Sequence, residues 1–216
     1  MALYAAFIDW KQAVADWLDV TSGSAYDRLG DYIHLSEIEL DRRLRLREAM
    51  AFNKTVIDND GIITLPSDYS QMKTVTVGPE CIPLEAVTPD RYLTLRSQTS
   101  FEAGQSIYYT IIGEKLNFVP LGSGMDVNIS YYRKADPLSD DVPENIYSIY
   151  APEALLAGAL KYGFKFLADE ERVAIWQGEF NTQVQALNSD AQKAELPSSP
   201  LKMRSGVRMS GRRRSF

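Results

Sequence analysis

The sequence has a single cysteine, Cys81, and a single histidine, His34, among its 216 residues. One cysteine excludes an internal disulfide framework and a cysteine-rich metal site. One histidine excludes a zinc site with two histidine ligands, and a catalytic Cys–His pair would have to use these two residues. We expect Cys81 to be a small buried apolar side chain, and His34 to lie on a helix surface or in a satisfied core position.

Long apolar runs and phosphate-binding loops are also missing. No run approaches the ~18 residues of a membrane span, so no membrane partner is predicted. The N-terminus lacks the basic start of a signal peptide, and Asp9 interrupts its apolar residues early. Neither G-x-x-x-x-G-K-[ST] nor G-x-G-x-x-G occurs, and we interpret Gly122-Ser123-Gly124 as a plain loop. These absences predict a protein that is made and kept in a reducing cytoplasm, or assembled from there into something larger, with no cofactor and no metal.

The net charge of −6 is distributed unevenly along the chain. Residues 197–216 hold six basic residues and no acidic one, which leaves 17 bases against 29 acids, a net charge of −12, in the first 196 residues. This basic arm is rich in Ser, Gly and Pro, which is typical of a disordered segment. We expect instead that another subunit or another protein holds the arm. At ~3.3 Å per residue, twenty extended residues reach about 65 Å, which is well beyond their own domain. The candidate partner-binding residues of the arm are Lys202, Arg204, Arg208, Arg212, Arg213, Arg214 and Phe216.

Apolar spacing predicts helices at both ends of the chain. Residues 3–18 place their large apolar side chains on one helical face, and a second helix is expected over about 25–51. A proline at the first helical position starts a third helix at Pro152, and Asp169 can cap a fourth that ends before Pro197. Asn188-Ser189 is expected to weaken this last helix.

Strand signals fill the middle third. Two hairpins are predicted, one turning at Asn59-Asp60-Gly61 and one at Gly113-Glu114, followed by a strand over 126–133. The expected fold class is α+β, in which two N-terminal and two C-terminal helices form a bundle with an inserted small antiparallel β subdomain and an extended C-terminal arm. The expected boundaries are 1–52 and 143–196 for the helical bundle, 53–142 for the β-rich insertion and 197–216 for the arm.

Three groups of side chains leave alternatives open. Tyr108-Tyr109 and Tyr131-Tyr132 are either cross-strand packing residues or an exposed strip on a partner interface. Paired acids could serve a glycoside hydrolase or could simply be loop and helix-end residues; they are Asp140 with Asp141, Glu37 with Glu39, and Asp169-Glu170-Glu171. A cluster of arginines near the end of the second helix either stabilises that helix terminus or pairs with acids of a neighbouring copy; it consists of Arg42, Arg43, Arg45 and Arg47.

The order and spacing of several segments resemble the head-to-tail adaptor (connector, or tail accessory) proteins of short-tailed bacteriophages. The resemblance covers most of residues 3–195, and the arm beyond Leu196 matches no motif of this family. The segments that carry it are, in chain order, Trp10 with Trp17, Tyr32-Ile33-His34-Leu35-Ser36-Glu37, Leu40-Asp41-Arg42-Arg43-Leu44-Arg45-Leu46-Arg47, Leu65-Pro66-Ser67-Asp68-Tyr69, Pro83-Leu84-Glu85, Thr88-Pro89, Ile129-Ser130-Tyr131-Tyr132-Arg133-Lys134, Ala151-Pro152-Glu153-Ala154-Leu155-Leu156, Asp169-Glu170-Glu171-Arg172 and Trp176.

The resemblance implies a non-enzymatic virion protein that forms a ring, commonly of twelve copies, docked under the portal protein. Such a ring would extend the DNA channel, without sequence-specific contact to the genome, and offer a platform for a downstream tail or nozzle protein. The small residues of the third predicted helix would suit close packing in a tight ring. Two other hypotheses stay open: a DNA-binding module that uses the basic arm, and a cell-wall glycoside hydrolase that uses the paired acids.

Overall fold

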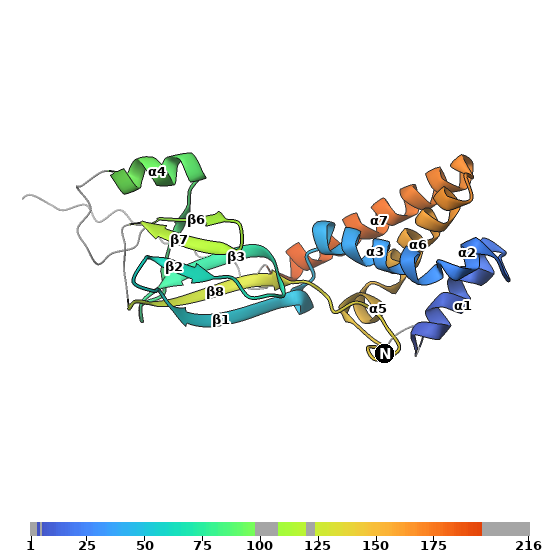
Figure 1. Cartoon of the computed structure of the whole chain (residues 1–216), viewed down its shortest axis with the longest axis horizontal. Helices are drawn as coiled ribbons and strands as arrows, with labels where there is room; N and C mark the ends of the chain where they lie inside the picture. The colour runs from blue at the N-terminus through green and yellow to red at the C-terminus, as the bar shows by residue number, and fades with distance from the viewer. Residues whose placement is uncertain (1–3, 5, 98–107, 120–123, 196–216) are drawn as a thin grey trace, which may run out of the picture.

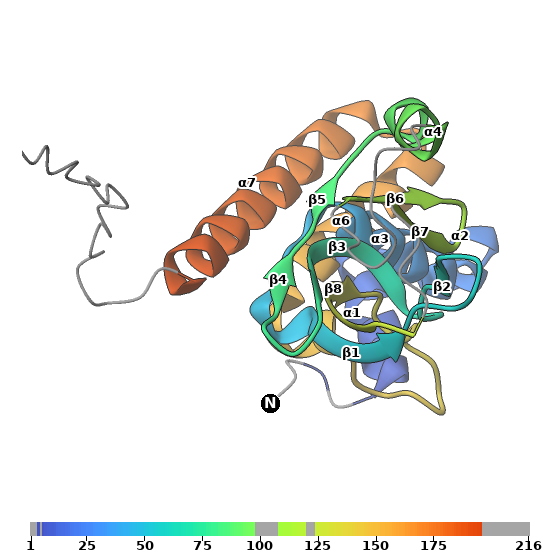
Figure 2. The same ribbon diagram turned by 90° about the vertical axis from the view of Figure 1, so that its left-hand side faces the viewer.

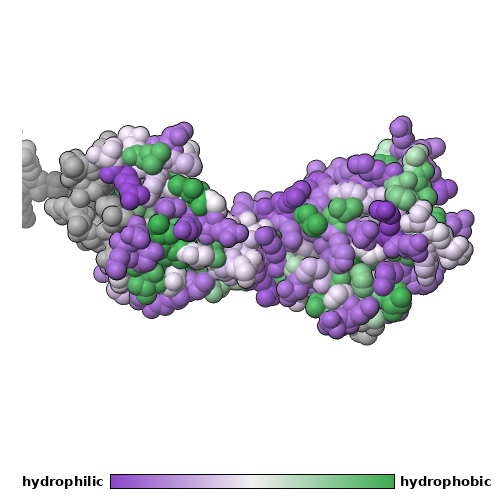
Figure 3. Space-filling view, viewed as in Figure 1, coloured by the Kyte–Doolittle hydropathy of each residue, from purple (hydrophilic) through white to green (hydrophobic). Residues whose placement is uncertain are grey.

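Figure 1 shows two lobes, one helical and one built of strands, joined by a short waist. The computed structural model describes residues 4, 6–97, 108–119 and 124–195. The space-filling view shows the same division, with a narrowing between the lobes (Figure 3). Helices and largely antiparallel sheets are segregated, so the fold class is α+β, as predicted.

The N-terminal half of the helical lobe contains α1 (Phe7–Leu18), α2 (Ser24–Asp27) and α3 (Leu29–Arg43). The prediction of one helix over 25–51 is wrong at its C-terminal end. After Arg43 the chain becomes extended, and Leu44 and Leu46 are both buried while Arg45 between them is not. This alternation has the period of a strand, and it leads through a 3₁₀ turn (Arg47–Ala49) directly into β1.

The C-terminal half follows the sequence signals closely. It contains α5 (Ile146–Tyr150), α6 (Pro152–Phe166) and α7 (Glu170–Glu195), with Pro152 in the first turn of α6. Asp169 caps α7 by accepting a hydrogen bond from the backbone N–H of Arg172 at 3.0 Å. The expected apolar face of α7 packs on the helical core, with Phe180 and Val184 buried.

Two four-stranded sheets build the other lobe. The first has the order β1 (Met50–Val56), β8 (Asp126–Arg133), β3 (Tyr69–Val77), β4 (Ile82–Pro83). The second has the order β2 (Ile62–Thr64), β7 (Lys115–Val119), β6 (Tyr108–Ile112), β5 (Glu85–Ala86), and α4 (Pro89–Ser97) packs against β6 and β7. The consecutive strands β4 and β5 pair with different sheets, so this short segment links one edge of both (Figure 2).

The predicted antiparallel β subdomain is only partly correct. The hairpin at Gly113-Glu114 is confirmed, since Ile112 and Lys115 are paired in register and Gly113 has a φ of 63°. The hairpin at Asn59-Asp60-Gly61 is wrong: the chain turns there, but β1 pairs with β8 and β2 pairs with β7. In addition, β5 runs parallel to β6.

Each lobe has its own hydrophobic core. The helical core includes Trp10, Ile33 and Leu160, and the strand core includes Phe118 and Ile129. Two of the four predicted strand tyrosines, Tyr109 and Tyr131, are buried in the strand core, and their neighbours Tyr108 and Tyr132 are half-buried. The hypothesis of an exposed tyrosine strip is therefore wrong: Tyr109 and Tyr131 pack between the two sheets, whereas Tyr108 packs against the cluster around α4 and Tyr132 against the helical core.

Small residues on α6 serve packing within the chain. A Cβ added at Gly158 would lie 2.1 Å from Ser36 Oγ of α3, and one added at Gly163 would lie 2.6 Å from a methyl group of Leu18 of α1. The close approach expected from these glycines is therefore made by α3 and α1 of the same chain.

Candidate interaction surfaces

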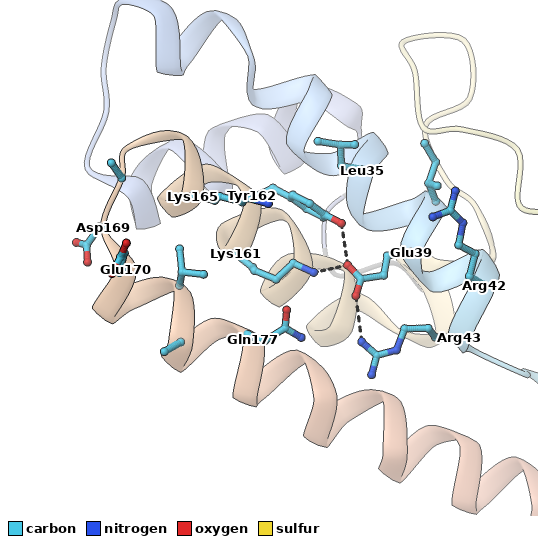
Figure 4. A pocket seen from close by; sticks show the side chains of 14 residues that line it. Leu35, Glu39, Arg42, Arg43, Lys161, Tyr162, Lys165, Asp169, Glu170 and Gln177 are labelled. Carbon is cyan, nitrogen blue, oxygen red and sulfur yellow. Dashed lines mark hydrogen bonds and ion pairs between the residues drawn. The ribbon is translucent and has the colours of Figure 1, made fainter.

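The described residues form an open groove of about 1110 Å³ between α3 and α7, with α6 at its base (Figure 4). We call it the α3–α7 groove. Leu35 and Ile38 of α3 line it together with Val173 and Ala174 of α7. Its charged lining residues are Glu39, Arg42, Arg43, Lys161, Lys165, Asp169 and Glu170.

Glu39 is the centre of the polar contacts in this groove. Its carboxylate accepts hydrogen bonds from Lys161 Nζ, from Tyr162 Oη at 2.8 Å and from Arg43 Nη1 at 3.0 Å. Partial burial by itself would raise the pKa of the Glu39 carboxyl, but these donors outweigh it and hold the pKa below its ordinary value. Burial and the neighbouring carboxylate raise the pKa of Tyr162 to about 12, so both groups keep one protonation state near neutral pH.

The sequence pattern did not single out Lys161, Tyr162 and Lys165. These three residues stand at i, i+1 and i+4 of α6, which places them on one face of a helix whose other faces are small and apolar. That polar stripe was a usable signal for the side of α6 that lines the α3–α7 groove, where Lys161 is buried and Lys165 is exposed.

The four clustered arginines have different surroundings. Arg43 pairs with Glu39 at 3.0 Å and also donates to Asn181 of α7, and Arg47 pairs with Glu48 at 3.4 Å. The Arg45 guanidinium donates to backbone carbonyls at the C-terminus of α3, namely those of Asp41, Arg42 and Leu44. Among the described residues, Arg42 has no ion-pair partner.

Glu37, considered above as a hydrolase carboxylate, joins the helices to the chain that returns from the sheets. It is buried and accepts hydrogen bonds from the Leu138 N–H at 3.0 Å, from Asn145 Nδ2 at 2.6 Å and from His34 Nδ1 at 2.9 Å. Burial raises its pKa against the opposing effect of these bonds. Asp140 and Asp141 are exposed in the linker before α5.

One turn further along α3, Asp41 makes a second set of hydrogen bonds between the two lobes. Its carboxylate accepts from the Ala135 N–H at 3.1 Å and from Tyr147 Oη at 2.6 Å, and its backbone carbonyl accepts from Ser70 Oγ at 3.1 Å. Burial and the Asp41 charge raise the pKa of Tyr147 far above its ordinary value. Glu37 and Asp41 together fix the strand lobe to the helical lobe.

The single histidine, His34, and the single cysteine, Cys81, lie in different surroundings. His34 is half-exposed, stacks on Phe7 with ring centroids 5.7 Å apart, and contacts Glu37, which agrees with the expected helix-surface position. Cys81 is exposed in a turn with a φ of 52°, so the expectation of a buried apolar side chain is wrong.

Neither a metal site nor a membrane span is found in the described part of the chain. No group of three or more His, Cys, Asp or Glu side chains there is placed to hold a metal ion. Among the same residues no helix combines the length and the apolar character that a membrane crossing requires.

Comparison with protein-family models matches residues 6–204 to the SU10 adaptor protein. The chain belongs to the SU10 adaptor family. It is therefore a phage head-to-tail adaptor protein, as the sequence motifs indicated. A search of curated proteins finds no match.

The family match of this adaptor reaches further than the motifs did, since it ends at Arg204 and so includes the beginning of the basic arm. The arm itself lies outside the described residues, as does part of the loop at Gly122-Ser123. The expected partner-binding residues of the arm, Lys202, Arg204, Arg208, Arg212, Arg213, Arg214 and Phe216, are thus not placed.

Proposed function

We propose that this adaptor forms a ring of twelve copies beneath the portal protein, extends the DNA channel and carries the downstream tail or nozzle protein. The observation that carries the proposal is the family match over residues 6–204. The role is structural and non-enzymatic, in the virion, after assembly in the host bacterial cytoplasm. The acidic body supports a channel wall that repels the genome, since a net charge of −12 lets DNA slide without binding.

The two lobes offer two separate contact regions. In the strand lobe, β1 is an edge strand whose Phe52 and Val56 side chains are 76% and 52% exposed. Exposed apolar side chains on an unpaired edge are typical of a surface that another protein covers. We assign this lobe to the tail proteins and the basic arm, which follows α7, to the portal or to a neighbouring copy.

The first experiment measures the mass of the purified protein alone and after mixing with its portal protein, by native mass spectrometry. A ring on the portal gives a defined multiple of the 24.3 kDa chain. If no oligomer forms under either condition, the proposed ring is wrong.

Deleting residues 197–216 tests the arm. We expect a folded protein with an unchanged circular-dichroism spectrum that no longer binds the portal, because all six cations of the arm are lost. A truncated chain that assembles on portal rings as the full chain does would contradict the assignment of the arm.

The charge of the arm also supports a second candidate, a DNA-binding module. Six cations would release several counterions, so binding to duplex DNA would weaken steeply with salt. A salt titration of DNA binding by the isolated protein separates the two functions, and no binding at low salt removes this candidate.

A further inference from the structure

The α3–α7 groove has apolar walls that no described residue covers. Leu35 and Ile38 are 42% and 47% exposed on the α3 side, and Ala174 is exposed on the α7 side. Large apolar side chains gathered at one hollow are typical of a surface that a partner covers.

Positive charge in the groove exceeds what its own acids neutralise. Four bases line it against three acids, and one of the acids, Asp169, already pairs with Arg172. Glu39 is held by three donors of the same chain, whereas Arg42 and Lys165 have no ion-pair partner among the described residues. A partner that fits must therefore bring both apolar and acidic side chains.

The outer face of α1 has this composition. It consists of Ile8, Asp9, Gln12, Asp16 and Trp17, all exposed, and Asp19 follows directly after the helix. Ile8 is 58% exposed, and Trp17 is 54% exposed although its ring meets the edge of Trp176. A shallow hollow of about 360 Å³ lies on this face between Asp9, Asp16 and Trp17.

These two surfaces lie on opposite sides of the same lobe. Gly163 of α6 contacts Leu18 of α1, and Lys165 of α6 faces the groove. Two residues correspond to about 200° around a helix, so α1 and the groove flank α6 from opposite directions. Figure 1 agrees, with α7 above α6 and α1 below it.

We propose that the α3–α7 groove receives the outer face of α1 from a second copy of this chain, with the α1 acids near Arg42 and Lys165. Because the surfaces differ and lie on opposite sides, each copy can bind the next one head to tail, and such a contact closes into a ring when the rotation allows it. The inference rests on the ring proposed above and names the surfaces that hold it together.

A charge-reversal experiment on the full chain tests this contact. The groove variant carries Arg42→Glu and Lys165→Glu, and the helix variant carries Gln12→Lys and Asp16→Lys; all four side chains lie outside both cores. Each variant alone brings like charges together, which should lower the assembled fraction about tenfold or more. Circular dichroism confirms that both variants are folded.

Mixing the two variants in equal amounts should restore the assembled mass. In an alternating ring, the acidic groove of one variant meets the basic helix of the other, and the remaining contacts are those of the natural chain. A ring of twelve copies permits this alternation. Native mass spectrometry, alone and with the portal protein, measures the outcome.

The possible results separate this inference from the ring itself. If the natural chain assembles and both variants assemble equally well, or if their mixture does not recover, the assigned contact is wrong and the ring stands. If the groove variant keeps its ring and loses only portal binding, the groove is a portal site and the inference is overturned. If the natural chain never assembles, both proposals fail.

Discussion

At the scale of single residues, two glycines of the long helices stand in opposite surroundings. Gly158 of α6 faces Ser36 so closely that an added Cβ would lie 2.1 Å from its Oγ, 2.9 Å from its Cβ and 3.1 Å from Phe180. Ser36 Oγ cannot turn away freely, because it donates to the Leu155 carbonyl at 2.9 Å in a fully buried position. Gly178 of α7 has no atom within 4 Å of an added Cβ.

Alanine at these two positions should therefore act in opposite directions. We expect Gly158→Ala to destabilise the fold by about 1–3 kcal/mol, because α3 and α6 must separate. We expect Gly178→Ala to stabilise it by about 0.5–1 kcal/mol, because alanine is the better helix former. Urea unfolding of both variants measures this, and an equal midpoint for the two would contradict the close α3–α6 contact.

The ion pairs of Glu39 should make the stability of the fold depend on pH. Its folded-state pKa is lower than its ordinary value of 4.5, so its contribution to stability is present above pH 4.5 and is lost as the pH falls through the folded pKa. Glu39→Gln should cost about 2 kcal/mol at pH 7, since it leaves the buried Lys161 without its counter-charge. The difference from the natural chain should shrink as the pH falls below 4.5, and it should vanish only below the folded-state pKa, where the Glu39 side chain is neutral in both states.

Urea midpoints at pH 7 and at pH 3.5 check this prediction. The control is Asp190→Asn, because Asp190 pairs with Lys193 in a bridge whose two side chains are each 73% exposed. That variant should change little at either pH. A Glu39→Gln effect that is the same at both pH values would show that the charge plays no part.

At the scale of secondary-structure elements, Asn188 attaches α7 to the chain that leaves α3. Its Oδ1 accepts from the Arg45 N–H at 2.8 Å, and its Nδ2 donates to the Arg43 carbonyl at 2.9 Å. The sequence pattern predicts a weak point of α7 here, and the helix nevertheless continues through it to Glu195. The polar side chain that interrupts the apolar face satisfies two backbone groups at a helix end.

Replacing Asn188 with leucine should release this attachment. Asn188→Leu leaves the Arg45 N–H and the Arg43 carbonyl without partners, at a cost of about 1–3 kcal/mol. Hydrogen exchange should then accelerate at the Arg45 amide before it does in α6. Gln185→Ala, an exposed change on the same helix, is the control and should leave that amide protected.

Local sequence signals explain which elements could be predicted. The start of α6 and the start of α7 depend on Pro152 and Asp169, which act on their own helix turns, and both predictions are confirmed. The end of α3 was missed because Leu44 and Leu46 alternate with arginines, and a short alternation is hard to separate from a helical face. The partners of β1 and β2 were missed because they lie far along the chain, where a turn signal says nothing about pairing.

The candidate surface was predictable only in part. Arg42 and Arg43 were singled out as a charged cluster, and both line the α3–α7 groove. Its other half comes from Lys161, Lys165 and the start of α7, which are more than 115 residues away from Arg43 in sequence. Only the packing of α3 on α6 brings the two halves together.

At the scale of the whole molecule, the position of the strand lobe depends on a few polar contacts at the waist. Asp41 bonds three groups there, on β3, on the segment after β8 and on α5. An adaptor that binds different proteins through its two lobes needs a defined geometry between them, so a rigid waist would serve the proposed function.

Asp41→Ala should weaken the contacts that hold the two lobes in position at the waist. The change leaves the buried Tyr147 hydroxyl and the Ala135 N–H without their acceptor, which should destabilise the protein by about 2 kcal/mol. Spin labels at Thr74→Cys and Gln185→Cys, in a Cys81→Ser background, report the distance between the lobes, since all three positions are exposed. We expect Asp41→Ala to have a broader distribution of this distance than the protein with Asp41. Asp41→Asn should have a narrower distribution than Asp41→Ala, because asparagine keeps a side-chain oxygen as acceptor. An equally sharp distribution in Asp41→Ala would mean that the lobes are held by other contacts, with Glu37 and its bonds to Leu138 and Asn145 as the remaining joint.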